Sequence, residues 1–169
     1  GEATLGPDHP KVGKFLVNLA ALYNAQGRRA EAEPLLKRSL AIAEKALGPD
    51  HSDVGRALEG LAELYRSQGR YAEAEPLLRR SLSIAEKAFG PDHPHVSSVL
   101  SCLADLYAAQ GRYAEAETLY MRGLAISEKI SGPDHPDVGA DLNSLAFLAM
   151  EHGDLLRATD YLRRSVEVW

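Results

Sequence analysis

Histidine next to aspartate is the recurring residue pair in this sequence that could do chemistry. The string Gly-Pro-Asp-His contains such a pair at Asp8-His9, Asp50-His51, Asp92-His93 and Asp134-His135. An imidazole beside a carboxylate can act as a general base or bind a metal ion. A metal site needs three or four ligands around one centre, whereas these histidines occur once in every 42 residues. We therefore interpret the string as a joint between structural units, and we predict no catalytic residue, metal site or cofactor.

Composition limits the other classes of function. The net charge is −5 with acids and bases interspersed, so no basic block indicates binding to nucleic acid or to a membrane surface. No apolar run approaches the roughly 20 residues that cross a bilayer. The one cysteine, Cys102, has no partner for an internal disulfide, which favours a reducing compartment and a cytoplasmic location. We expect Cys102 to be inert and partly buried.

The joints divide the chain into four repeats. They begin at Gly6, Gly48, Gly90 and Gly132, at intervals of 42 residues. A fixed period in this range is typical of a solenoid. We predict a single domain over residues 1–169 with repeats 6–47, 48–89, 90–131 and 132–169. The last repeat is truncated, and residues 2–5 align with the tail of a preceding helix.

Each repeat carries two helical patterns. Apolar residues in the first arm recur at i, i+4, i+7 and i+11, as in Val54, Leu58, Leu61 and Tyr65, which is one stripe of an α-helix. The first repeat therefore has a helix A at about residues 10–25 and a helix B at about residues 29–46. Gly27 and its equivalents are expected to end helix A. The aspartates of the joints (Asp8, Asp50, Asp92 and Asp134) are expected to cap the next helix A, with proline close behind.

The residues of these arms resemble a known family. The segments LAALYNAQGRRAEAEPLLKRSLAIAEKALGPDH (19–51) and LAELYRSQGRYAEAEPLLRRSLSIAEKAFGPDH (61–93) are similar to the tetratricopeptide repeat (TPR), in its 42-residue kinesin-light-chain-like form. The fourth repeat departs from this pattern, with Ala149 in place of tyrosine and Asp154 in place of arginine. The resemblance implies an all-α solenoid, a right-handed superhelix of four helix-turn-helix repeats, whose A helices line a concave groove for a peptide or a partner's helix.

Comparison of the four repeats indicates where binding occurs. We call a set of equivalent positions in the four repeats a column. On helix B, the outward columns keep their residue types, which predicts a face for solubility and for ion pairs between repeats. One such column is Arg38, Arg80, Arg122 and Arg164. On helix A, no outward column keeps one residue type in all four repeats, which predicts a recognition face. Recent duplication followed by uneven drift is the alternative explanation. The predicted binding residues are Lys14, Val17, Asn18, Ala21, Asn24, Arg56, Glu59, Glu63, Arg66, Ser98, Ser101, Asp105, Asn143, Phe147 and Met150.

These patterns favour a non-catalytic protein-interaction module that binds a peptide of mixed charge. Positive charge is expected at Lys14, Arg56 and Arg66. Phe147 and Met150 are either an apolar platform for the ligand or a surface that packs against a following helix. The alternative is an architectural or oligomerisation segment, or a sensor arm, of a larger signalling protein. Because a repeat buries its face against a neighbour, we also expect self-association of the terminal repeat through Val166, Val168 and Trp169. An enzyme is not supported, since no nucleophile and base fall on one face and no phosphate-binding loop is present.

Overall fold

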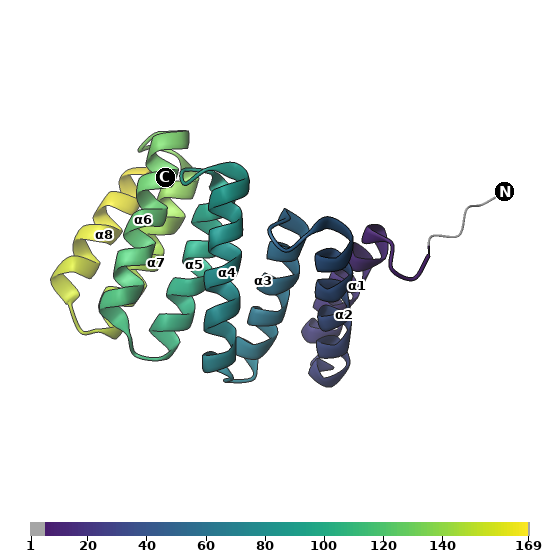
Figure 1. Cartoon of the computed structure of the whole chain (residues 1–169). Coiled ribbons are helices and arrows are strands. Elements are labelled where there is room, and N and C mark those ends of the chain that lie inside the picture. The colour runs from purple at the N-terminus through teal and green to yellow at the C-terminus, as the bar shows by residue number, and fades with distance from the viewer. Residues whose placement is uncertain (1–5, 169) are drawn as a thin grey trace. The chain divides into compact units, whose positions relative to one another are not determined.

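The computed structural model describes residues 6–168, which form eight α-helices and contain no strand. The helices are α1 (Pro10–Ala25), α2 (Arg29–Leu47), α3 (Ser52–Ser67), α4 (Tyr71–Phe89), α5 (Pro94–Ala109), α6 (Tyr113–Ser131), α7 (Pro136–Glu151) and α8 (Leu155–Val168). Figure 1 shows them as consecutive helical hairpins, one per repeat. The predicted all-α class is confirmed, and the predicted bounds of the first two helices agree with α1 and α2 to within one residue.

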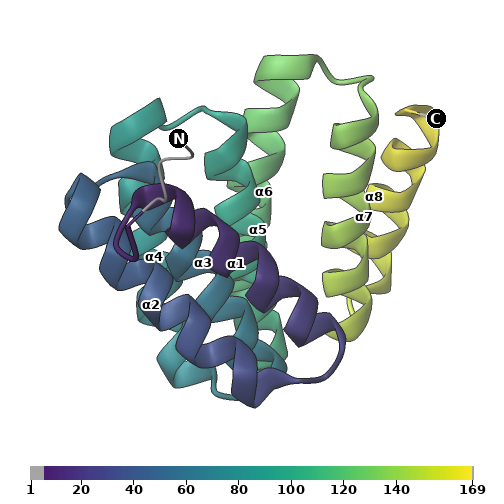
Figure 2. The same cartoon turned by 90° about the vertical axis from the view of Figure 1, so that its right-hand side faces the viewer.

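The helices belong to two compact units, the first ending at Ala88 and the second beginning at Phe89. In unit 1, α1 packs against α2 and α3, and α2 packs against α3. In unit 2, α6 packs between α5 and α7, and α8 packs on α7 (Figure 2). Each unit therefore contains two repeats, and the chain divides where the second repeat passes into the third.

The predicted apolar stripe of the A helices forms the core in most repeats. In α3 its members Val54, Leu58, Leu61 and Tyr65 are all buried. In α1, by contrast, Leu19 is exposed, because none of the described helices covers this side of α1. The stripe is thus the surface through which a repeat packs on its neighbour.

Glycine ends each A helix as expected. Gly27, Gly69, Gly111 and Gly153 have φ between +72° and +83°, a conformation that side chains with a Cβ rarely adopt. In the first repeat, the amide of Arg28 donates to the carbonyl of Tyr23 at 2.8 Å, the long bond of a Schellman ending. The turn between helices A and B is therefore set by one residue type at one position.

The helix caps at the joints differ from the prediction. Histidine, not aspartate, is the N-cap: Nδ1 of His9, His51, His93 and His135 accepts from the backbone amide two residues later, at 3.1–3.2 Å. The prediction for Asp8, Asp50, Asp92 and Asp134 was wrong because each helix begins directly after the histidine, which leaves the aspartate one position too early.

Three of these aspartates instead join the two ends of their own repeat. Asp8 pairs with Lys45 at 2.8 Å, Asp50 with Lys87 at 3.4 Å, and Asp92 with Lys129. The hydrogen bond and the charge of Lys45 lower the pKa of Asp8. In the first three repeats, the Asp-His pair thus has a structural task in both of its residues, which agrees with the interpretation of the string as a joint.

A glycine and a serine face each other where helices A and B of a repeat cross. The pairs are Gly13 with Ser39, Gly55 with Ser81, and Gly139 with Ser165, whereas the third repeat has Ser97 on helix A and Gly123 on helix B. The serine hydroxyl donates to the glycine carbonyl from Ser39 at 2.8 Å, from Ser97 at 3.3 Å and from Ser165 at 3.2 Å. The exchange of the two residue types between helices indicates that the crossing has room for one side chain.

This crossing predicts a non-additive effect on stability in unit 2. In Gly123→Ser a new Cβ lies 3.1 Å from Ser97 Oγ, so overpacking is expected to cost about 1–2 kcal/mol. In Ser97→Gly the lost hydroxyl and a second helical glycine are expected to cost about 2 kcal/mol. The double variant restores the arrangement of the other repeats. We expect it to be more stable than the sum of the single effects by at least about 1 kcal/mol in urea unfolding; additive effects would contradict one shared space.

Candidate functional site

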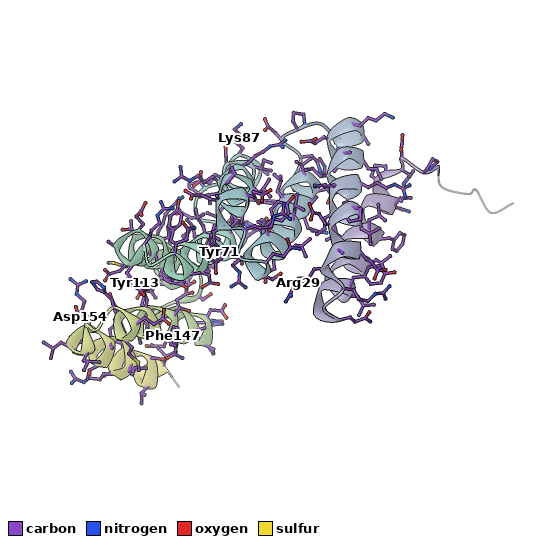
Figure 3. The ribbon with its side chains drawn as sticks, turned by 90° about the horizontal axis from the view of Figure 1, so that it is seen from below. Arg29, Tyr71, Lys87, Tyr113, Phe147 and Asp154 are labelled. Carbon is purple, nitrogen blue, oxygen red and sulfur yellow. The ribbon has the colours of Figure 1, made fainter. Side chains whose placement is uncertain are left out.

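The predicted binding residues lie on the outward face of the A helices, and none of the fifteen is buried. In unit 1 they come from α1 and α3, which lie next to each other. In unit 2 they come from α5 and α7, where Phe147 and Met150 are 63% and 52% exposed. Figure 3 shows Phe147 on α7 among the side chains of unit 2. Each unit therefore presents its own stretch of this face to solvent.

Several charges on this face already have partners within unit 1. Lys14 Nζ lies 3.2 Å from Asp53, and Arg66 makes two hydrogen bonds of 2.8 and 2.9 Å to Glu63 on the same helix. Glu59 accepts from the hydroxyl of Ser81 at 2.6 Å. Pairing reduces the net field of Lys14 and Arg66, so the positive charge expected on this face depends on Arg56.

On unit 2, the same face borders a pocket of about 330 Å³ whose lining includes five serines. Ser98 and Ser101 contribute from α5, Ser127 and Ser131 from α6, and Asp141 from α7. The hydroxyl of Ser127 donates to Asp141 at 2.6 Å, and burial raises the pKa of Asp141. In unit 1, the equivalent hollow, where Lys14 pairs with Asp53, measures about 10 Å³.

Sequence reasoning missed Ser127, Ser131 and Asp141 in this pocket. They do not lie on the outward face of helix A, and only the approach of α6 to α7 brings them beside Ser98 and Ser101. The signal in the sequence was the replacement of Lys14 and Leu47 by serine at the matching positions of the third repeat.

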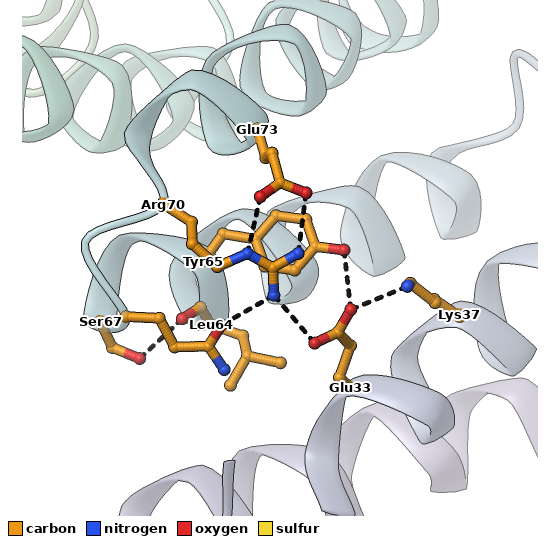
Figure 4. A network of polar contacts seen from close by, with 8 residues as sticks. Glu33, Lys37, Leu64, Tyr65, Ser67, Arg70 and Glu73 are labelled. Carbon is orange, nitrogen blue, oxygen red and sulfur yellow. Dashed lines mark hydrogen bonds and ion pairs between the residues drawn. The ribbon is translucent and has the colours of Figure 1, made fainter. Parts of the chain in front are cut away.

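A polar network links the two repeats of unit 1 at the turn end of α3 (Figure 4). The guanidinium of Arg70 lies 3.9 Å above the centre of the Tyr65 ring and pairs with Glu73 at 2.7 Å and with Glu33 at 2.9 Å. The Tyr65 hydroxyl donates to Glu33 at 3.1 Å. Lys37 also binds Glu33, and Lys37, Arg70 and Tyr65 together lower the pKa of this carboxyl.

The same arginine–tyrosine stack occurs in the first three repeats. Arg28 lies 4.1 Å above Tyr23, and Arg112 lies 3.8 Å above Tyr107. The sequence reasoning treated these tyrosines as members of the apolar stripe and did not find the stack. The signal was present, because an arginine follows each of these three tyrosines by five residues and is absent where the tyrosine is absent.

In the fourth repeat, this arrangement is replaced by a pocket. Ala149 stands in the place of the tyrosine, and Asp154 stands in the place of the arginine and accepts from the amide of Arg157 at 3.1 Å. A pocket of about 550 Å³ lies here, with Leu145, Leu148 and Ala149 of α7 on one side and Tyr113 of α6 on the other. Figure 3 labels Tyr113 and Asp154, which lie near each other in unit 2.

The exposure of Cys102 and of the residues expected to self-associate bears on two further expectations. Cys102 is exposed, so the expectation that it is partly buried was wrong; it lies on the outward face of α5, between Ser101 and the start of the buried stretch at Leu103. Of the residues expected to self-associate, Val166 is 73% exposed and Val168 is partly exposed. Trp169 lies outside the described residues.

Residues 6–168 contain neither a candidate metal site nor a candidate membrane-spanning helix. In this range, no group of three or more histidine, cysteine, aspartate or glutamate side chains could hold a metal ion. No helix in the same part of the chain is long and apolar enough to span a membrane.

Comparison with known proteins decides the family. The family model described as tetratricopeptide repeat matches residues 2–45, 11–87, 53–101 and 95–169, which is almost the whole chain. The chain belongs to the TPR family. No curated protein matches it in sequence. TPR domains are generally scaffolds for protein–protein interaction and not enzymes, and this TPR chain shows the all-α solenoid class that its repeats predicted.

Two solved structures show which kind of TPR protein this chain resembles. A putative kinesin light chain with nearly identical TPR-like repeats, from Podosopora anserina, is 30% identical with a TM-score of 0.83, over 98% of this TPR chain and 78% of its own. BtubC (BKLC) from P. vanneervenii is 22% identical with a TM-score of 0.84, over 94% of this chain and 64% of its own. The chain thus spans less than two thirds of BtubC. The predicted resemblance to kinesin-light-chain-like repeats is confirmed.

Proposed function

We propose that this TPR chain is a non-catalytic interaction module that binds a peptide or a partner's helix along the outward faces of its A helices. The observation that carries the proposal is the contrast between the two exposed faces. The A-helix face differs in every repeat, although it is open to solvent. The B-helix face repeats its residues and uses them internally: Arg80 pairs with Glu44, and Arg164 with Glu128, each across two repeats. A single domain over residues 1–169 and a cytoplasmic location remain part of the proposal.

The chemistry of the faces indicates the ligand. On unit 1, Arg56 is an exposed cation, which favours an acidic side chain of the ligand. On unit 2, Phe147 and Met150 form an exposed apolar pair, and apolar pairs of this kind serve as anchors for apolar side chains in peptide recognition. An acidic ligand segment therefore matches the face of unit 1, and a segment with a large apolar residue matches the face of unit 2.

A displayed peptide library tests the proposal. After selection on the immobilised chain, binding of the best peptide is measured against Arg56→Glu and against Phe147→Ala with Met150→Ala. For a peptide that binds unit 1, we expect Arg56→Glu to weaken binding by about tenfold, and for a peptide that binds unit 2, we expect the same of the Phe147 and Met150 changes. Tenfold corresponds to about 1.4 kcal/mol. The matched control is Arg29→Glu, which makes the same charge change at an exposed position of α2. Equal effects of Arg56→Glu and Arg29→Glu would contradict the assignment of the A-helix face.

A second candidate is self-association, which the apolar surface of α8 favours. Leu155, Leu156, Leu162 and Val166 are all exposed on this helix. TPR hairpins cover such surfaces by stacking, so a second copy of the chain is a suitable partner. Light scattering over a concentration series tests this: we expect association that Val166→Asp abolishes. A monomer at every concentration would exclude it.

A further inference from the structure

The pocket beside Ala149 has a counterpart in unit 1 that is filled. There, the ring of Tyr65 occupies the space between the end of α3 and the start of α2 and is only 5% exposed. Its hydroxyl reaches Glu33 on α2, and Arg70 covers its face (Figure 4). The repeat therefore provides a template for what this space accepts: a phenol ring with a carboxylate at its hydroxyl and a guanidinium above it.

Unit 2 keeps the carboxylate and the apolar wall of this template but has Ala149 at the position of Tyr65. Glu117 of α6 is the equivalent of Glu33, and Leu145 and Leu148 are the equivalents of Leu61 and Leu64. All three residues line the pocket at Ala149. Replacement of tyrosine by alanine at this position removes the ring and leaves the acceptor and the apolar wall in place. The volume of about 550 Å³ is within the range of ligand pockets, roughly 300–1,000 Å³.

The charges and rings around the pocket suit an aromatic occupant. Arg157 pairs with Glu117 at 2.8 Å, as Arg70 pairs with Glu33, and its side chain is mostly exposed. Glu117 already accepts from Arg157 and, at 3.4 Å, from the hydroxyl of Tyr161. A carboxylate has about four acceptor sites, and Glu33 binds three donors at once, so Glu117 can accept a further hydroxyl beside these two. Tyr113 and His152 stand at the rim with their ring centres 5.3 Å apart, which adds two aromatic faces for stacking.

We propose that this pocket binds the side chain of a tyrosine from a partner peptide, with its hydroxyl donating to Glu117 and its ring between α6 and α7. The site is distinct from the A-helix face, because the described residues that line it include none of the fifteen predicted binding residues. The proposal therefore does not rest on the proposed groove. It names a second recognition point on the same module.

Small phenols test the proposal directly. N-acetyl-tyrosinamide is titrated into the isotope-labelled chain, and backbone amide shifts are followed by NMR, with N-acetyl-phenylalaninamide as the comparison. We expect shifts confined to residues 111–117 and 145–157 and a preference of about threefold or more for the phenol, as for one added hydrogen bond. Shifts centred elsewhere, or equal affinity for both compounds, would overturn the proposal.

Two variants keep the test decisive. Ala149→Tyr restores the residue of the other repeats and is expected to fill the pocket, to raise the melting temperature and to weaken binding of N-acetyl-tyrosinamide at least about tenfold. Glu117→Gln is expected to remove the preference for the phenol while retaining weak binding of the ring, even if Ala149→Tyr folds poorly. Ala125→Tyr, at an exposed position of α6, is the matched control and should bind as the unchanged chain does. Unchanged binding by Ala149→Tyr would exclude the pocket.

Discussion

Replacement of Leu58 by alanine is expected to lower the free energy of unfolding by about 3 kcal/mol, within the range of about 2–5 kcal/mol for buried leucines. Leu58 is fully buried and belongs to a cluster with Val54, Ala43 and Ile84, which come from three different helices of unit 1. The change removes apolar contacts and leaves a cavity between α2, α3 and α4. Urea unfolding followed by far-UV circular dichroism measures the loss.

The control for this prediction is Leu22→Ala, which removes the same atoms from an exposed position of α1. We expect an effect below about 0.5 kcal/mol there, because a solvated side chain contributes little to packing. Equal losses in the two variants would mean that Leu58 does not anchor the packing between the repeats of unit 1.

Replacement of Tyr65 by alanine is expected to be comparably severe, at about 3–4 kcal/mol. The ring is buried between two repeats, and its loss also leaves the stacked Arg70 and the acceptor Glu33 without their contact to it. Tyr65→Phe keeps the ring and the stack and removes the hydroxyl that donates to Glu33. We expect it to cost only about 1 kcal/mol, the net value of one partly buried hydrogen bond.

The difference between these two variants separates packing from hydrogen bonding. Thermal unfolding of Tyr65→Ala and Tyr65→Phe in parallel gives the two terms, with Phe15→Ala on the exposed face of α1 as the control. If Tyr65→Phe proved as damaging as Tyr65→Ala, the hydrogen bond to Glu33 would outweigh the ring. For an occupant of the pocket at Ala149, the hydroxyl would then matter more than the aromatic ring.

Much of the fold followed from local patterns in the sequence. The period of 42 residues, the helices near 10–25 and 29–46 and the turn glycines all depend on residues within one helical hairpin. Helical periodicity and the need for positive φ act over a few residues, so they can be recognised without knowledge of the fold. The outward position of the predicted binding residues follows from the same geometry.

Side-chain partners could not be derived in this way. Asp8 contacts Lys45, which lies 37 residues later, and Tyr65 contacts Glu33, which lies 32 residues earlier. Which of several nearby carboxylates a cation reaches depends on how the helices cross and on the rotamers that packing allows. The error over the helix caps has the same origin, because a shift of one residue at a helix start exchanges the roles of Asp8 and His9.

The sequence by itself therefore determined the repeat, the helices, the family and the face that varies. The tertiary structure alone decided which charges of that face are already paired, and that the exchange of tyrosine for Ala149 leaves a pocket instead of a collapsed contact. The physical reason is that a pattern of residue types fixes local backbone geometry, whereas an unfilled volume exists only where elements distant in the chain are held apart by their other contacts.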